Sequence, residues 1–147
     1  MVVYGSPKRG RLYGVTGSDP VTGSDIAWRV TTDKVWMLKS AVFTMAAGSG
    51  SSGTARSPYF QVSGSDGTVY WKVYSGHDYV SGSGVVTYYW IAGLPSETLD
   101  TGSAIVVSPL PSGILLDDSM TMGSSTTNID TADNWSSPTF LVEEYSE

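Results

Sequence analysis

The stretch Val85-Val86-Thr87-Tyr88-Tyr89-Trp90-Ile91-Ala92 decides the fold class of this chain. Its residues are mostly β-branched or aromatic, none is charged, and glycine borders the run on both sides at Gly84 and Gly93. Such a run predicts a strand with apolar bulk on both faces, in the middle of a sheet. Because side chains alternate along a strand, one face must meet a second sheet. The other face must meet a neighbouring subunit or a surface that tolerates tyrosine.

The composition around this strand favours a single all-β domain. A length of 147 residues suits one core, and 17 glycines with only 15% charged residues suit short strands joined by loops rather than a helical bundle. The absence of cysteine excludes disulfides, thiolate metal sites and a cysteine nucleophile. No apolar run reaches the ~18–20 residues that span a bilayer, and no signal peptide is evident, so we expect no membrane partner and a mature chain that begins near residue 1.

Alternating hydrophobic segments separated by turn residues predict a two-sheet β-sandwich or jelly roll of about eight strands. Residues 31–34 should form a tight hairpin-length connection, the second strand should bend near Lys39-Ser40, and Pro109 should end strand pairing. The Gly/Ser-rich segment Ala46–Arg56 is expected to be a flexible loop too polar to be buried. The predicted strands are Ile26–Val30, Val35–Met45, Tyr59–Ser63, Val69–Tyr74, Val85–Ala92, Ala104–Ser108, Ile114–Leu116 with Ser119–Met122, and Thr139–Tyr145.

Large aromatic residues inside the predicted strands identify the candidate core. We expect most of them to lie between the two sheets, because buried aromatics are the usual case. The alternative is that the tryptophans mark a surface on which carbohydrate stacks. The candidate core residues are Trp28, Trp36, Trp71, Trp90 and Phe140.

Charge is distributed unevenly along the chain, whose net charge is −6. Residues 1–72 hold all eight lysines and arginines and four acidic residues, a net charge of +4, whereas residues 73–147 hold ten acidic residues, a net charge of −10. This division can support docking between subunits. Alternatively, strands from the two halves interleave in one sandwich and the charges mix. A pI near 4.5 argues against nucleic acid as a partner.

Residues 1–25 are predicted to form an extended N-terminal arm, and residues 26–147 the sandwich domain. The first segment alternates turn formers with single hydrophobic residues and has too little apolar surface for a core of its own. We expect this arm to dock the sandwich on a partner. The candidate partner-binding residues are Tyr4, Lys8, Arg9, Arg11 and Tyr13.

Residues that carry chemistry are sparse, and the sequence predicts neither an enzyme nor a cofactor. The single histidine, His77, lies in a loop without a nucleophile elbow around it. The segment Asn128–Asn134 concentrates oxygen ligands of the kind that calcium takes, but it lacks EF-hand spacing, and these residues are also ordinary turn formers. We therefore expect no metal site.

From residue 26 onward the chain resembles small structural proteins of tailed-bacteriophage virions. The residues that carry the resemblance are Val35–Ala41, Tyr59–Val62, the aromatic strand with its Gly-Leu-Pro turn, Pro109–Pro111 leading into Ile114–Leu116, Asp130–Asp133, and Leu141–Tyr145. The resemblance implies a jelly-roll-like capsid decoration (cement) protein, or otherwise a collar, tail or fibre component. It implies a homo-oligomer, with a trimer favoured, that docks on the major capsid protein or another virion protein. The protein would then reside in the virion after assembly in the host cytoplasm.

A second class of function also remains open. The chain could be a carbohydrate-binding or receptor-binding module that uses exposed tyrosines as stacking platforms. The candidates for this role are Tyr70, Tyr74, Tyr79 and Tyr89. Exposed aromatic rings around a shallow groove would favour this function, whereas the same rings buried against another copy of the chain would favour the structural one.

Overall fold

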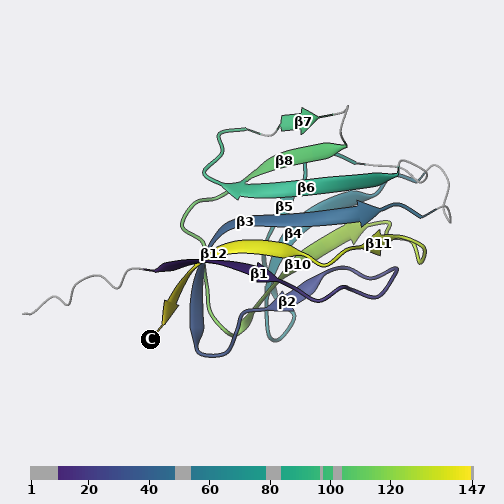
Figure 1. Ribbon diagram of the computed structural model, residues 1–147. Coiled ribbons are helices and arrows are strands. Elements are labelled where there is room, and N and C mark those ends of the chain that lie inside the picture. Colours follow the sequence, from purple (N-terminus) through teal and green to yellow (C-terminus); the bar gives the residue numbers. More distant parts are fainter. Residues whose placement is uncertain (1–9, 49–53, 79–83, 97, 101–103, 147) are drawn as a thin grey trace, which may run out of the picture.

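The computed structural model describes residues 10–48, 54–78, 84–96, 98–100 and 104–146. Within these ranges it contains twelve strands and no helix (Figure 1), which confirms the all-β prediction. Strands β1, β7 and β11 were not expected from the sequence. The strands are β1 (Arg11–Thr16), β2 (Ala27–Arg29), β3 (Lys34–Ala46), β4 (Ser57–Gly64), β5 (Val69–Tyr74), β6 (Val85–Ala92), β7 (Thr98–Asp100), β8 (Ile105–Leu110), β9 (Leu115–Leu116), β10 (Met120–Thr127), β11 (Asn134–Trp135) and β12 (Thr139–Ser146).

The strands form two sheets that pack as a sandwich, as predicted. The larger sheet has the order β1-β12-β3-β6-β8-β7, and β9 and β11 also pair with β3. The smaller sheet has the order β2-β10-β4-β5 and lies behind the larger one in Figure 1. Neighbouring strands are antiparallel, apart from the parallel pair β6 and β8. The arrangement is consistent with a jelly roll.

Strand β3 is the centre of the larger sheet, because it pairs with β6, β9, β11 and β12. Its buried side chains are Trp36, Leu38, Ala41, Phe43 and Met45. The alternation changes phase at Lys39-Ser40, where the pairing with β12 also shifts: Leu141 lies opposite Ser40, but Val142 lies opposite Leu38. A β-bulge that adds one residue to β3 explains both observations. The bulge lies where the sequence predicted a bend.

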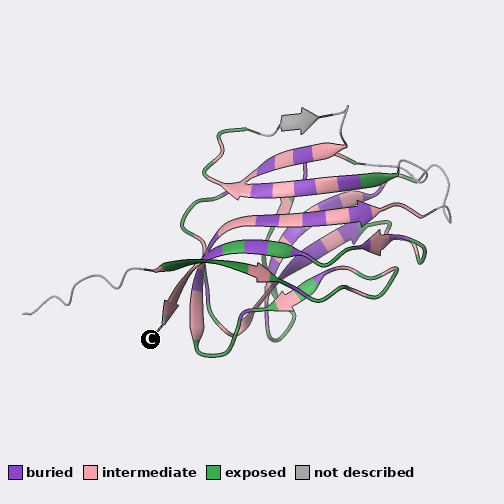
Figure 2. Cartoon of the chain, in the orientation of Figure 1, coloured by how far each residue is buried: buried purple, intermediate pink, exposed green. Residues whose placement is uncertain are grey.

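Strand β6 is the uncharged stretch that decided the fold class, and it lies between β3 and β8 in the middle of the larger sheet. Val86, Tyr88 and Trp90 are buried between the sheets. Thr87 and Tyr89 point to the opposite side and are half-buried. Figure 2 shows the same alternation of buried and half-exposed residues along β3, β6 and β8.

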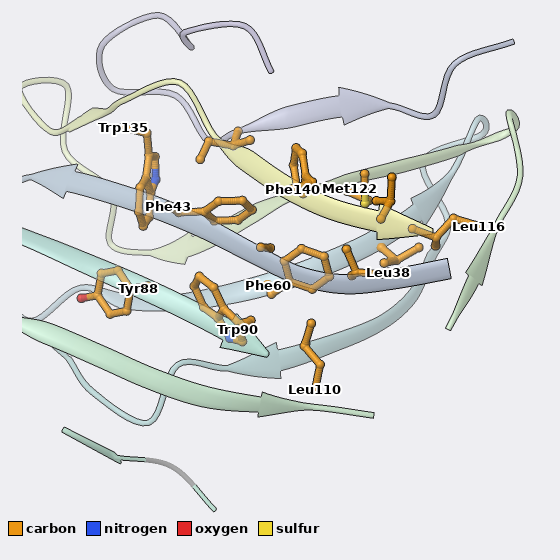
Figure 3. Close-up of a cluster of buried hydrophobic side chains, with 14 of the residues drawn as sticks. Leu38, Phe43, Phe60, Tyr88, Trp90, Leu110, Leu116, Met122, Trp135 and Phe140 are labelled. Carbon is orange, nitrogen blue, oxygen red and sulfur yellow. The ribbon is translucent and has the colours of Figure 1, made fainter. Parts of the chain in front are cut away.

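Phe43 of β3 stands in the middle of an aromatic cluster that joins the two sheets (Figure 3). Its ring centroid lies 5.3 Å from Trp90, 5.7 Å from Phe140, 5.8 Å from Phe60 and 6.1 Å from Trp135. These neighbours come from β6, β12, β4 and β11. Tilted and edge-on pairs at such separations add about 0.5–1.5 kcal/mol each beyond the burial of their surface. The cluster therefore helps to set the position of the larger sheet relative to β4 of the smaller sheet.

The five predicted core residues divide into two groups. Trp36, Trp90 and Phe140 are buried, whereas Trp28 and Trp71 are half-buried and pack against the margin of the core. Sequence reasoning missed Trp135, which is buried on the two-residue strand β11. Its polar neighbours in the chain gave no strand signal, although its size alone favours burial.

The sandwich begins earlier than the predicted boundary at residue 25. Residues 11–16 form β1, which pairs antiparallel with β12 at the margin of the larger sheet. Asp25 then accepts hydrogen bonds from the hydroxyls of Ser124 and Thr126 on β10, each 2.7 Å long. Residues 1–9 lie outside the described part of the chain. Single hydrophobic residues cannot build a core, but backbone pairing with an existing strand needs none, and this is why residues 11–25 join the sandwich.

Two predicted connections differ in the structure. Residues 31–34 do not close a hairpin, because β2 belongs to the smaller sheet and β3 to the larger one, and the connection crosses between them. Pro109 does not end β8, which continues to Leu110 with Pro109 opposite Ile91. On its other side β8 pairs with β7 only from Ile105 to Val107. Pro109 lies beyond this pairing, where no described strand is on that side of β8. The missing backbone N–H of proline therefore costs little. The hairpin predicted around Gly64–Gly67 is present as β4 and β5.

Candidate functional site

Three ion pairs in the described ranges join the basic first half of the sequence to its acidic second half. Lys34 pairs with Glu144 at 3.5 Å, Lys39 with Glu143 at 2.9 Å, and Arg56 with Asp133 at 2.9 Å. Each pair joins a basic residue of the first half to an acidic residue of the second half. The cause is topological, because β12 lies beside β3 and the segment before β11 lies beside the end of β3. These charges therefore mix within one sandwich.

Arg56 and Asp133 form a buried pair that the sequence did not predict. The prediction that Ala46–Arg56 is too polar to be buried is wrong at Arg56, whose side chain, like that of Asp133, is fully buried. Arg56 donates from Nε and Nη2 to the two carboxylate oxygens of Asp133, and from Nη1 to the carbonyl of Thr54 at 3.0 Å. The two opposite charges can be buried here because each neutralises the other and their hydrogen-bonding groups are paired.

The Asp133 carboxylate is further held by the backbone. The amide of Gly48 donates to one oxygen and the amide of Asp130 to the other, each at 2.8 Å. Burial alone raises the pKa of Asp133, but the hydrogen bonds from Arg56, Asp130 and Gly48, together with the charge of Arg56, lower it below its ordinary value. Asp133 therefore stays ionised and ties Gly48 and Arg56 to the turn that contains Asp130.

In the candidate calcium segment, protein contacts occupy both carboxylate oxygens of Asp133 and one of Asp130. Asp133 accepts four hydrogen bonds, as described above, and one oxygen of Asp130 accepts from the amide of Ala132 at 2.9 Å. Within the described ranges, no three His, Cys, Asp or Glu side chains lie close enough to hold a metal ion. The arrangement is that of a hydrogen-bonded turn.

The loop around His77 has no catalytic geometry. The hydroxyl of Ser75 donates to the backbone carbonyl of His77 at 2.9 Å, not to its ring. Asp78 accepts instead from the phenol of Tyr74. Ser75 is buried, and its own carbonyl accepts from the hydroxyl of Ser108. A nucleophile, a base and an orienting acid are therefore not aligned at this loop.

Part of the outward side of the larger sheet is uncharged and is bordered by the Lys39–Glu143 ion pair; we call this part the apolar outer face. Register places Val42, Tyr89 and Val107 in one row across β3, β6 and β8. A second row holds Leu141, Ser40, Ile91 and Pro109. Ile105 lies on the same side as Val107 on β8. These residues are half-buried within the single chain, apart from Leu141, which is 38% exposed. The apolar outer face comprises Val42, Tyr89, Ile91, Ile105, Val107 and Leu141.

The outward side of the smaller sheet is different in character, and we call it the tyrosine face. Lys72 and Tyr74 lie on this side of β5, opposite Gln61 and Tyr59 of β4. The rings of Tyr59 and Tyr74 are 5.3 Å apart and tilted by 44°. Lys72 Nζ lies 4.7 Å from the centre of the Tyr59 ring and donates to Ser125 Oγ on β10 at 2.9 Å. The tyrosine face comprises Tyr59, Gln61, Lys72, Tyr74 and Ser125.

The predicted partner-binding residues are placed only in part. Arg11 and Tyr13 are exposed on β1, whereas Tyr4, Lys8 and Arg9 lie outside the described residues. Figure 2 shows most of β1 as exposed. Of the four candidate stacking tyrosines, Tyr74 lies on the tyrosine face, Tyr89 lies on the opposite side of the sandwich, and Tyr79 is not among the described residues. Tyr70 is the extra residue of a β-bulge in β5, and its hydroxyl lies beside Gly64 of β4. Tyr59, which sequence reasoning placed in a strand but not in a site, joins Tyr74.

Comparison of the chain with family models, curated proteins and solved structures gives no significant match. In the described part of the chain, no helix is long and apolar enough to cross a membrane. Function must therefore be inferred from the two outer faces and from the pattern of the sequence.

Proposed function

We propose that the chain is a non-enzymatic structural protein of a tailed-phage virion, a capsid decoration (cement) protein that forms a homo-oligomer and docks on the major capsid protein. The observation that carries this proposal is the apolar outer face. Four adjacent strands present uncharged side chains around the row Val42, Tyr89 and Val107, and the Lys39–Glu143 ion pair lies at the border of this surface. A surface of this kind marks a site of protein contact. The resemblance of the sequence to virion proteins supports the choice of partner.

The size of this face limits what it can do alone. Strands lie about 4.8 Å apart and rise about 3.4 Å per residue, so four strands over about five residues cover roughly 300 Å². A stable interface buries about 800 Å² on each partner. The apolar outer face can therefore form the centre of an interface, and other segments must complete it. Residues 1–9, which include Lys8 and Arg9 and precede β1 in the sequence, are proposed to do so.

The occupant of the apolar outer face is proposed to be another copy of the chain. An uncharged face excludes a partner that brings a charge into the contact without a counter-charge, because burying it would be costly. This chain carries such an uncharged surface itself. The trimer implied by the resemblance then presents its arms together to the shell.

Sedimentation velocity of the purified chain tests the oligomer. Val107→Lys on the apolar outer face should shift the protein to monomer, whereas the matched change Thr127→Lys on the exposed end of β10 should not. A wild-type chain that remains monomeric at high concentration would refute the role of this face.

Immunogold labelling tests the place in the particle. Antibodies against the chain should label the capsid surface in phage particles from the source of the sequence. Labelling of the collar, tail or fibre would instead support the alternative virion position, and its absence from every particle would reject a virion role.

A further inference from the structure

We propose that the free edge of β1 pairs with β1 of a second copy of the chain, in antiparallel register about a two-fold axis at Gly14. Among the described strands β1 pairs only with β12, so its other edge is open. Val15 is half-buried, and the other residues of β1 are exposed (Figure 2). An open strand edge is a site at which a further strand can be added.

The other three edge strands carry features that hinder pairing with another chain. Strands β2 and β7 have three residues each. Strand β5 contains a β-bulge at Tyr70 and exposes Lys72. Very short strands, bulges and lysines are the usual protection of sheet edges. Strand β1 has six residues, keeps an unbroken register with β12 and contains neither proline nor lysine. Among the described strands, β1 is therefore the edge best suited to pairing.

The hydrogen bonds to β12 show which backbone groups of β1 are available. The amide of Gly17, just after β1, donates to the carbonyl of Pro138 at 2.8 Å. Hydrogen-bonded and non-hydrogen-bonded positions alternate along an antiparallel pair, so every second residue back from Gly17 also bonds with β12. The remaining residues direct their N–H and C=O groups to the open edge. These residues are Leu12, Gly14 and Thr16.

A two-fold axis at Gly14 gives each of these residues a partner. Gly14 then lies opposite Gly14 of the second copy, and Leu12 lies opposite Thr16. Each of the three residues donates one hydrogen bond and accepts one. An axis at Tyr13 or at Val15 would leave one of the three without a partner within β1. The axis at Gly14 therefore satisfies the most backbone groups, and the contact is the same from both copies.

The side chains of β1 fit this register. Tyr13 lies opposite Val15 of the second copy at a non-hydrogen-bonded position, where side chains approach most closely, and aromatic and β-branched residues pair favourably there. Arg11, the one charged residue of β1, lies opposite Gly17, so no two like charges face each other. A Cβ at Gly14 would have no neighbour within 4 Å, so space is open beside the axis.

Pairing through β1 differs from contact through the apolar outer face. A two-fold axis between antiparallel strands is perpendicular to the sheet, so both apolar outer faces lie on the same side of one continuous sheet. Their combined area is roughly 600 Å², twice that of one copy. Two strands alone form a marginal contact in water. We therefore expect β1 to link copies that other contacts bring together, and in this respect the inference rests on the proposed function.

Disulfide cross-linking tests the register, because the chain contains no cysteine of its own. Facing Cα atoms at a hydrogen-bonded position lie about 5.5 Å apart, within the range of roughly 4.4–6.8 Å that a disulfide spans. Gly14→Cys should form a dimer on a non-reducing gel after mild oxidation at high protein concentration. Leu12→Cys alone and Thr16→Cys alone should not, since each is about 13 Å from its own copy along the strands. A mixture of these two variants should cross-link.

The outcomes are distinct. Cross-linking of Gly14→Cys or of the mixture, with neither single control cross-linked, supports the pairing. The absence of cross-links in both samples would overturn it, as would equal cross-linking of the single controls. An edge already covered by another segment of the chain would give the first of these two results.

A charge on the axis tests whether the contact depends on the edge. Gly14→Lys places two ammonium groups next to each other in the pair, so it should reduce cross-linking of the mixed Leu12→Cys and Thr16→Cys proteins to the level of the single variants. Its thermal melt should stay unchanged, because a side chain at this position meets open space. Thr127→Lys is the matched control and should cross-link as before. Equal cross-linking in the two lysine variants would overturn the proposal.

The two self-association proposals can fail separately. A wild-type oligomer in sedimentation, together with no cross-linking through β1, would refute the edge and leave the apolar outer face in place. A wild-type monomer in sedimentation, together with cross-linking of Gly14→Cys, would support the edge and refute the role of the apolar outer face.

Discussion

The side chains of Arg56 and Asp133 meet at 2.9 Å with neither exposed to solvent, although 77 residues separate them in the sequence. The Lys39–Glu143 pair has the same 2.9 Å separation but is about one-third exposed. The two pairs therefore differ in burial and in the additional hydrogen bonds that hold Asp133. This makes them a matched test of what burial does to an ion pair in this fold.

Asp133→Ala should destabilise the protein by about 3–5 kcal/mol, because it leaves the Arg56 guanidinium buried without its counter-charge. Glu143→Ala should change the free energy of unfolding by less than about 1 kcal/mol, since its partner Lys39 remains solvated. Urea titration followed by tryptophan fluorescence measures both. Equal effects of the two variants would show that Arg56 is hydrated or mobile in solution. The double variant Arg56→Met/Asp133→Leu should recover much of the loss.

Stability should decline in acid in a way that depends on Asp133. Its pKa is lower in the folded protein than the ordinary value of 3.8. A carboxyl of this kind stabilises the fold above its unfolded pKa, and the contribution is lost as the pH falls through the lower folded pKa. Urea midpoints should therefore fall below about pH 4, and less steeply in Asp133→Asn than in wild type. Identical slopes in the two proteins would assign the acid sensitivity to other carboxyl groups.

Trp90→Ala should cost about 3–5 kcal/mol, the usual result of emptying a buried aromatic position. Tyr70→Ala should cost much less, because Tyr70 is 52% exposed. Denaturant titration of the two variants gives the comparison. The reverse order would mean that the inner and outer faces are wrongly assigned.

Truncation should separate docking from folding. Removal of residues 1–9 is expected to leave the thermal melt by circular dichroism nearly unchanged and to weaken self-association and shell binding. Removal of residues 1–25 should lower the melting temperature, because it deletes β1 and the contacts of Asp25 with β10. Lys8→Ala/Arg9→Ala/Arg11→Ala should weaken docking in a salt-sensitive manner. Full docking by the 1–9 truncation would show that these residues are dispensable.

Chelation provides a further test. Added EDTA should leave the melting temperature unchanged, because the oxygens of Asp133 are occupied by Arg56 and backbone amides. A fall of several degrees, reversed by calcium, would indicate that the segment 128–134 holds a metal ion.

The sequence predicted those parts of the fold that depend on local pattern. The alternation in β6, the β4–β5 hairpin and the bend at Lys39-Ser40 are all properties of neighbouring residues, and each is present. The charge pattern also left open the interleaving of the two halves, which the ion pairs of β3 with β12 now explain.

The features that sequence reasoning missed depend on distant partners. Strand β1 is defined by pairing with β12 more than a hundred residues later, not by an apolar pattern of its own. Arg56 and Asp133 each lie among turn-forming residues that predict exposure, and nothing local reveals that they meet. The tyrosine face depended on Tyr59, whose role becomes visible only when β4 and β5 are placed side by side.

The position of β12 has a consequence for synthesis of the chain on the ribosome. Both β1 and much of β3 pair with this strand, which contains the last residues described. Until residues 139–146 leave the ribosome, β3 keeps one side largely unpaired and β1 has no partner among the described strands. Unpaired strand edges in a nascent chain are prone to associate with other chains. The larger sheet therefore closes only after residues 139–146 have left the ribosome, and premature termination shortly before residue 139 should yield an aggregating product instead of a smaller folded domain.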